Sequence, residues 1–128
     1  MEMLYKKTTI LVVDDEESVR RVVVRMLGDE YVVLEATNGW EAVDIAHRHQ
    51  PDIILMDIMM PKMDGYIACS KIKTDQATKH IPIVMLTAVG QELNKKLAHT
   101  MGAEGYITKP FTQQDLLDAI YRLVKSAK

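Results

Sequence analysis

The sequence contains only one cysteine, Cys69. A single cysteine cannot form a disulfide within the chain or build a cysteine metal site, so both are excluded. A chain without a disulfide framework is typical of a reducing compartment, and we expect this protein to act in the cytoplasm. Cys69 itself is interpreted as a small buried hydrophobic residue.

Long apolar runs and an excess of one charge are also missing. No stretch approaches the roughly 20 apolar residues that cross a bilayer, and residues 1–7 lack the features of a signal peptide. We therefore expect no membrane association. The formal net charge is −2, without a basic stripe, so we expect no direct nucleic-acid binding.

The residues that are present fit one globular domain. Of the 128 residues, 48% are hydrophobic and 27% charged, as in ordinary globular proteins. There is no repeat, low-complexity segment or linker, so we predict a single domain over residues 1–128. The same sequence fits a stand-alone protein and a module of a longer one.

The stretch that ends at Asp57 has the pattern of a strand buried on both faces. Residues 53–56 are Ile-Ile-Leu-Met and lead directly into Asp57. A short apolar run of this kind is typical of a central parallel strand. Pro51 and Pro61 bracket it and cannot donate ladder hydrogen bonds. Asp57 is thus expected at the carboxyl end of a central strand, where open α/β sheets bind ligands.

Strand-like and helix-like segments alternate along the chain. Helical spacing of apolar residues follows each β-rich run, with Asn38 and Thr112 as N-caps and Gly28 as a helix terminator. This alternation predicts an α/β fold with a parallel sheet and helices on both faces. The predicted strands are 8–14, 31–36, 53–57, 81–86 and 104–108.

Three arginines, Arg20, Arg21 and Arg25, lie outside the apolar stripe of the first predicted helix. We expect them to be solvated, with a partner-docking face as the alternative.

Residues with reactive or charged side chains stand at the ends of four predicted strands. They are Asp14-Asp15, Asp57, Thr87 and Lys109. A parallel sheet brings these ends to one edge, where three carboxylates repel one another and at least one pKa should rise. A divalent cation would remove the conflict, and a few hard oxygen ligands suit Mg²⁺. A carboxylate can also attack phosphorus to give an aspartyl phosphate, with the cation and Lys109 balancing charge on the phosphoryl oxygens.

Four sequence blocks stand at the predicted strand ends: residues 13–16 (VDDE), 56–65 (MDIMMPKMDG), 86–88 (LTA) and 106–111 (YITKPF). Together they resemble the signature motifs of bacterial response-regulator receiver domains, the family of chemotaxis-type regulators. The resemblance extends from about residue 8 to residue 125. It implies a flavodoxin-like, doubly wound fold with strand order 2-1-3-4-5.

The resemblance also implies roles for single residues in phosphorylation. Asp57 is the phosphoacceptor, and it binds Mg²⁺ together with Asp15. Asp14 acts on the ion mainly through a water molecule, and the carbonyl oxygen of Met59 is the remaining protein ligand. Lys109, which precedes a proline expected to be cis, engages the phosphoryl group.

A switch is implied as well. Thr87 binds the phosphoryl group and moves toward it, which leaves space for Tyr106 to turn inward. This changes the surface formed by the fourth helix, the fifth strand and the fifth helix. A sensor histidine kinase, a histidine phosphotransfer protein or acetyl phosphate would supply phosphate. The readers would be an effector protein or an output domain, and phosphorylation could drive homodimerisation. Such a protein is not an enzyme with a separate substrate, although it takes part in its own phosphorylation and dephosphorylation.

Two positions depart from fast-hydrolysing members of that family. Met59 and Val89, which flank the site, are apolar, whereas polar residues there can position a hydrolytic water. We therefore expect slow self-dephosphorylation.

Other functions of this topology are less consistent with the sequence. A flavodoxin-like nucleotide binder needs a Ser/Thr/Gly-rich loop after the first strand, where this chain has acids, and the G-x-G-x-x-G fingerprint is missing. A phosphatase of the haloacid-dehalogenase type needs a second acid two residues after the nucleophile, and that position is Met59. A degenerate receiver that only binds partners would lack acceptor-site residues, and all of them are present.

Overall fold

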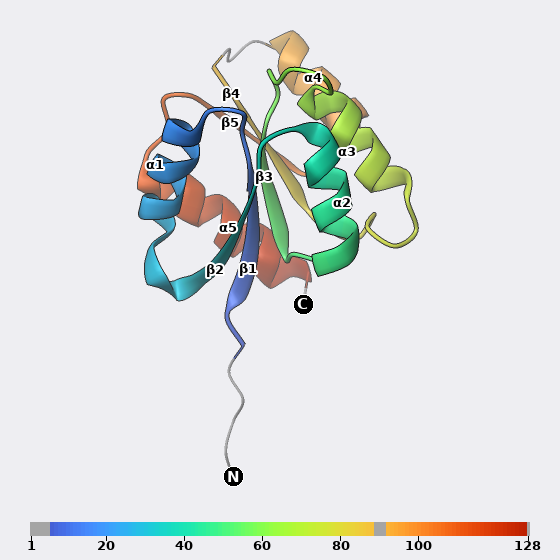
Figure 1. Cartoon of the computed structure of the whole chain (residues 1–128). Helices are drawn as coiled ribbons and strands as arrows, with labels where there is room; N and C mark the ends of the chain where they lie inside the picture. Colours follow the sequence, from blue (N-terminus) through green and yellow to red (C-terminus); the bar gives the residue numbers. More distant parts are fainter. Residues whose placement is uncertain (1–5, 89–91, 128) are drawn as a thin grey trace.

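The computed structural model describes residues 6–88 and 92–127. The chain enters at the lower end of the first strand in Figure 1 and alternates between strands and helices. The strands are β1 (Thr8–Val13), β2 (Tyr31–Ala36), β3 (Ile53–Asp57), β4 (Ile83–Thr87) and β5 (Gly105–Thr108). The helices are α1 (Glu17–Leu27), α2 (Gly39–His49), α3 (Gly65–Thr74), α4 (Glu92–Thr100) and α5 (Gln113–Ala127).

All strand pairs are parallel, and the sheet order is β2-β1-β3-β4-β5. The predicted fold class and strand order are therefore confirmed. The predicted start of β4 at residue 81 was wrong by two residues. Pro82 has no N–H to donate, and it contributes only its carbonyl, which accepts from Ile54 at 3.0 Å.

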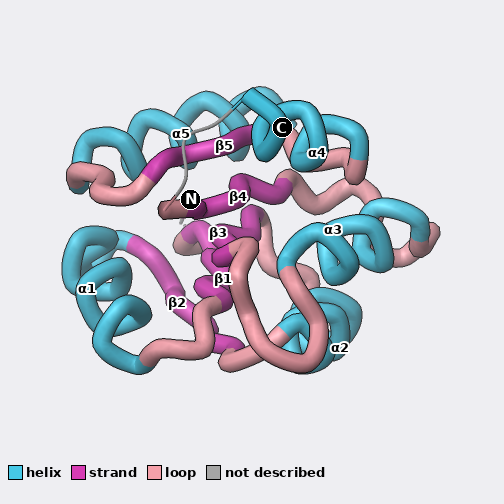
Figure 2. Tube along the Cα trace, turned by 90° about the horizontal axis from the view of Figure 1, so that it is seen from above, coloured by secondary structure: helices cyan, strands magenta, loops and turns pink. Residues whose placement is uncertain are grey.

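The sheet separates two cores because successive residues of its strands point to opposite faces. Along β3, Ile54 and Met56 pack under α2, α3 and α4, whereas Ile53 and Leu55 pack under α1 and α5. Figure 2 shows this arrangement from above, with α1 and α5 on one face and the other three helices on the opposite face. All five residues of β3 are buried.

The expected helix ends are also present. The Asn38 side chain accepts from the Glu41 N–H at 2.9 Å, and Thr112 and Asp115 form a reciprocal capping box at the start of α5. Gly28 ends α1 with φ of 74°, a left-handed value that favours glycine. The sequence did not predict the short 3-10 helix that follows, η1 (Gly28–Glu30).

None of the helices in the described part of the chain combines the length and the apolar character needed to cross a bilayer.

Candidate functional site

Three aspartates meet at the carboxyl edge of the sheet. Asp14 follows β1 directly, Asp15 comes next in the turn, and Asp57 is the last residue of β3. One oxygen from each carboxylate lies within 4.8 Å of the others. Asp14 and Asp57 are only 1% and 6% exposed, whereas Asp15 is exposed. The structure thus brings together the acids that the sequence predicted at one edge.

Lys109 reaches the same point from the loop after β5. Its Nζ lies 3.4 Å from Oδ2 of Asp14 and 3.4 Å from Oδ1 of Asp57. The loop is fixed where the Lys109 N–H donates to the carbonyl of Thr87, and the Lys109-Pro110 bond is cis, as predicted. The site therefore contains an ammonium group between two buried carboxylates.

One carboxyl group is strongly perturbed. Burial raises the pKa of Asp57 from its usual 3.8 to about 6; nearby Lys109 opposes this rise, and the charges of Asp14 and Asp15 add to it. The sequence analysis predicted a raised pKa from repulsion among the acids; the direction is the same, but burial contributes most and repulsion only adds to it. The lysine alone does not compensate the negative charge at Asp57.

The loop after β3 is shaped by close backbone contacts. The Ile58 N–H donates to Leu86 O at 3.2 Å, and the Gly65 N–H donates to Ile58 O at 2.8 Å. A Cβ on Gly65 would collide with the Asp57 carbonyl oxygen, so only glycine fits there. Met59 is 73% exposed in this loop, and Val89 lies outside the described residues.

One residue of the site's surroundings was missed by the sequence analysis. Arg20 donates from Nη1 to the main-chain carbonyl of Asp14 at 2.8 Å, and its side chain is only 12% exposed. The prediction of solvated arginines holds for Arg21 and Arg25, which are exposed, and was wrong for Arg20. No signal in the helical pattern distinguishes it, because the contact depends on where the turn places the carbonyl.

The family model described as "Response regulator receiver domain" matches residues 10–121. This chain is a receiver domain of that family. It is 45% identical over 112 residues to the chemotaxis protein CheY of Halobacterium salinarum, covering 87% of this chain and 92% of that protein.

Two further relatives differ in length and context. The "Probable transcriptional regulator ycf27" of Guillardia theta is 40% identical and matches 88% of this chain, which spans only 44% of that protein's length. The crystal structure of the receiver domain of sensor histidine kinase PA1611 from Pseudomonas aeruginosa has a TM-score of 0.82 and 31% identity. The match covers 94% of this chain and 99% of that one, and that structure has a magnesium ion coordinated in its active-site cleft.

The acidic cluster of this receiver is compatible with Mg²⁺. All three side chains offer carboxylate oxygens, which are the ligands that this ion prefers. Burial contributes most to the raised pKa of Asp57 and the charges of Asp14 and Asp15 add to it, so a bound cation would favour the ionised form.

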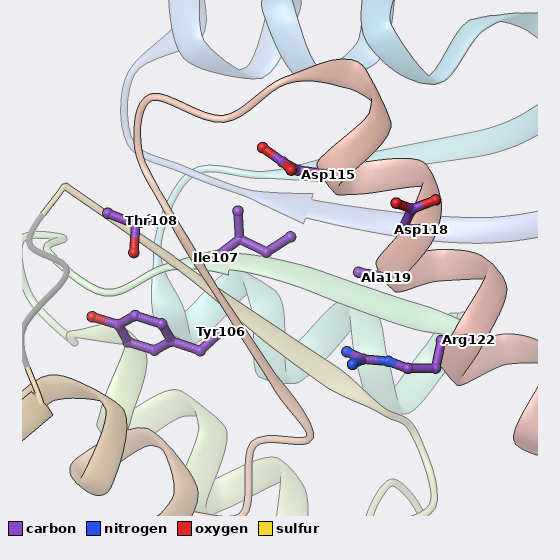
Figure 3. Close-up of a pocket in the computed structure, with 7 residues that line it drawn as sticks. All are labelled: Tyr106, Ile107, Thr108, Asp115, Asp118, Ala119 and Arg122. Carbon is purple, nitrogen blue, oxygen red and sulfur yellow. The ribbon is translucent and has the colours of Figure 1, made fainter.

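The two residues predicted to form the switch lie on neighbouring strands: Thr87 ends β4 at the carboxyl edge of the sheet, and Tyr106 lies within β5. Thr87 is buried at the end of β4, opposite Thr108 of β5. Tyr106 is partly buried and lines a hollow of about 460 Å³ between β5 and α5 (Figure 3). The same hollow is bordered by Asp115, Asp118 and Arg122 of α5, and in Figure 3 the Arg122 side chain points toward β5. Tyr106 therefore connects the core beside the site with a charged outer surface.

Proposed function

We propose that this receiver is a phosphorylation-dependent switch of two-component signalling that accepts a phosphoryl group on Asp57 in the presence of Mg²⁺. Its donors would be a sensor histidine kinase or a histidine phosphotransfer protein in the cytoplasm, with acetyl phosphate as a small-molecule substitute. It would act as a phosphoacceptor with slow self-dephosphorylation rather than as an enzyme with its own substrate.

The observation that carries the proposal is the position of the Asp57 carboxylate. It is buried at a strand end, 3.4 Å from the Lys109 ammonium and within reach of the other two acids. With a pKa of about 6, the Asp57 carboxyl group is mostly ionised at neutral pH and can act as a nucleophile. Added positive charge is needed to offset the negative charge of the incoming phosphoryl oxygens.

The transfer step follows from this geometry. A carboxylate oxygen of Asp57 forms a bond to phosphorus while the bond from phosphorus to the donor nitrogen or oxygen breaks, and that electron pair leaves with the donor. Lys109 moves from its contact with Asp57 to a phosphoryl oxygen, and the Thr87 hydroxyl donates to another. Asp15, Asp57 and the Met59 carbonyl would hold Mg²⁺, with Asp14 acting through water, and the ion would supply positive charge beside the phosphoryl oxygens.

The response would pass through Thr87 and Tyr106. Displacement of Thr87 toward the phosphoryl group opens space for Tyr106, whose inward rotation alters the hollow beside α5. A partner that prefers one of the two surfaces then reads the phosphorylation state. Because this chain matches nearly all of a CheY and less than half of a transcriptional regulator, an effector protein and an attached output domain both fit as readers. A phosphorylation-dependent homodimer is a third way to read the same surface.

The phosphorylated state should be long-lived. Met59 is exposed and apolar beside the acceptor, so it offers no hydrogen bond to a hydrolytic water. We expect Met59→Asn to shorten the acyl-phosphate lifetime several-fold, measured by loss of the phosphorylated mass over time. An unchanged lifetime would contradict this part of the proposal.

The main test is incubation with Mg²⁺ and acetyl phosphate, followed by intact-mass measurement. Wild type should gain a single phosphoryl adduct, and Asp57→Asn should gain none. The matched control is Asp52→Asn, at the other end of the same strand, which should be modified like wild type. Modification that persists in Asp57→Asn would assign the acceptor to another residue.

A further inference from the structure

Arg20 makes two well-directed contacts at the turn that carries the acids. Nη1 donates to the main-chain carbonyl of Asp14 at 2.8 Å, and Nε donates to Oε1 of Glu35, near the end of β2, at 2.9 Å. The Arg20 side chain is 12% exposed, and that of Glu35 is 46% exposed. The planar guanidinium suits this role because its donors point in fixed, different directions.

The contact completes the fixation of Asp14. Its N–H donates to Ala36 O at 3.1 Å, its Oδ1 accepts from the Glu16 N–H at 2.9 Å, and its carbonyl is held by Arg20. That carbonyl shares a rigid peptide plane with the N–H of Asp15. Fixing its direction therefore also fixes the direction in which the chain enters Asp15, the exposed acid of the cluster.

The effect of Arg20 should be geometric more than electrostatic. The guanidinium bonds the main chain of Asp14, and it is already paired with the Glu35 carboxylate, so the Arg20–Glu35 pair contributes little net charge. A substituted residue that keeps the positive charge but cannot span both acceptors should therefore not replace it.

We propose that Arg20, oriented by Glu35, is a positioning residue that holds Asp14 and Asp15 in the arrangement that binds Mg²⁺. This inference rests on the proposed function, because it assumes that these acids hold the ion. The competing explanation is that Arg20 only ties α1 to the sheet and contributes to stability. The two explanations differ in what happens to metal affinity once stability has been measured separately.

The test compares Arg20→Gln, Arg20→Lys and Glu35→Gln with the matched control Arg21→Gln. Arg21 is the next residue on the helix, its side chain is 72% exposed, and it pairs only with Glu17 among the ion pairs of the described residues. Each variant is titrated with MgCl₂ by calorimetry, and its urea unfolding is recorded in EDTA. Amide NMR spectra in EDTA then report the position of the 14–16 turn without any metal.

We expect Arg20→Gln to weaken Mg²⁺ binding roughly tenfold, the size typical of losing a residue that orients metal ligands. Arg20→Lys should weaken it nearly as much, Glu35→Gln less, and Arg21→Gln not at all. The amide signals of Asp15 and Glu16 should shift in Arg20→Gln even in EDTA. The double variant Arg20→Gln/Glu35→Gln should bind Mg²⁺ like Arg20→Gln alone, because Glu35 acts through the arginine.

Wild-type Mg²⁺ affinity in folded Arg20→Gln would overturn the inference while leaving the proposed function intact. Full rescue by Arg20→Lys would overturn the geometric argument in the same way. If Arg20→Gln does not fold, unchanged affinity in both Arg20→Lys and Glu35→Gln would overturn it. A wild-type protein that binds no Mg²⁺ would instead overturn the proposed function, and this inference with it.

Discussion

The two ends of β3 carry one aspartate each, and the two residues have opposite environments. At the amino end, Oδ2 of Asp52 accepts from the Thr9 N–H at 2.8 Å, and the Asp52 N–H donates to Thr9 O at 2.8 Å. At the carboxyl end, Asp57 lies beside two further acids and contacts Lys109. Asp52 completes the pairing between β3 and β1, whereas Asp57 has charge that the protein alone does not balance.

The neighbouring strands repeat this contrast. At the amino edge of β4, Glu104 accepts from the Ile83 N–H at 2.9 Å and pairs with Lys73 at 2.6 Å. Lys73 also donates to Ile81 O at 2.8 Å. The charges at the amino edge therefore satisfy the backbone and one another. At the carboxyl edge, three acids lie close together instead. In the proposed function, this concentration of negative charge is what binds the cation.

The strongest test of this contrast is Asp57→Asn. The Asp57 pKa is about 6 in the folded protein and near 3.8 when unfolded. Below pH 3.8 the group is neutral in both states. As the pH rises to 6, the unfolded state loses the proton first, so folding loses stability and the full cost is present above pH 6. Two pKa units correspond to about 3 kcal/mol.

In EDTA, Asp57→Asn should therefore raise the free energy of unfolding by about 3 kcal/mol at pH 8, and the gain should vanish near pH 4. Urea unfolding across this pH range measures both. Since asparagine cannot ionise, the difference in the free energy of unfolding between the two proteins should follow the titration of Asp57 alone. A variant that is less stable than wild type at pH 8 would mean that Lys109 already compensates Asp57.

At the amino edge, replacing a charged residue should instead lower the free energy of unfolding. Lys73→Met removes the donor to Ile81 O and leaves Glu104 without its ammonium partner. Because the lysine is 11% exposed and the glutamate 37%, partial solvation of Glu104 limits the loss to about 2 kcal/mol. Urea unfolding of Lys73→Met beside the exposed control Lys79→Met measures it. Equal stabilities of the two variants would show that the pair at the amino edge is not structural.

The sequence was more informative about the carboxyl edge than about the amino edge. Asp14, Asp57, Thr87 and Lys109 could be placed together because each ends or directly follows a recognisable strand, and a parallel sheet brings those strand ends to one edge. The partners of Lys73 could not be predicted, since they are 8 and 31 residues away along the chain. Nor could the bond from Arg20 to Asp14, because side-chain contacts of this kind depend on turn geometry that the hydrophobic pattern does not specify.

Added Mg²⁺ should reduce the difference between the two edges. A ligand that binds only the folded state stabilises it by about 1.4 kcal/mol at ten times its dissociation constant. Binding needs the ionised acid, so the gain should grow as the pH rises through about 6. Unfolding with MgCl₂ or with NaCl of equal ionic strength measures this effect. Asp15→Asn should remove most of this gain in stability, because it removes a proposed ligand of the ion. The fold itself should be little affected, because Asp15 is exposed. An equal gain in both salts would mean that general screening, not a site, is responsible.

The smallest effect is expected for Asp52→Asn, the counterpart of the first substitution on the same strand. Asparagine keeps an oxygen that can accept from the Thr9 N–H, but the bond loses the strength that the charged acceptor gives it. We expect a loss of about 0.5 kcal/mol in the free energy of unfolding, opposite in sign to Asp57→Asn and unaffected by Mg²⁺. Both variants exchange aspartate for asparagine, one directly before β3 and one at its last residue, so they differ in environment and not in chemistry. If Asp52→Asn and Asp57→Asn both stabilised the protein, removal of any negative charge would help this acidic chain. The difference between the two edges of the sheet would then not be the cause of the effect at Asp57.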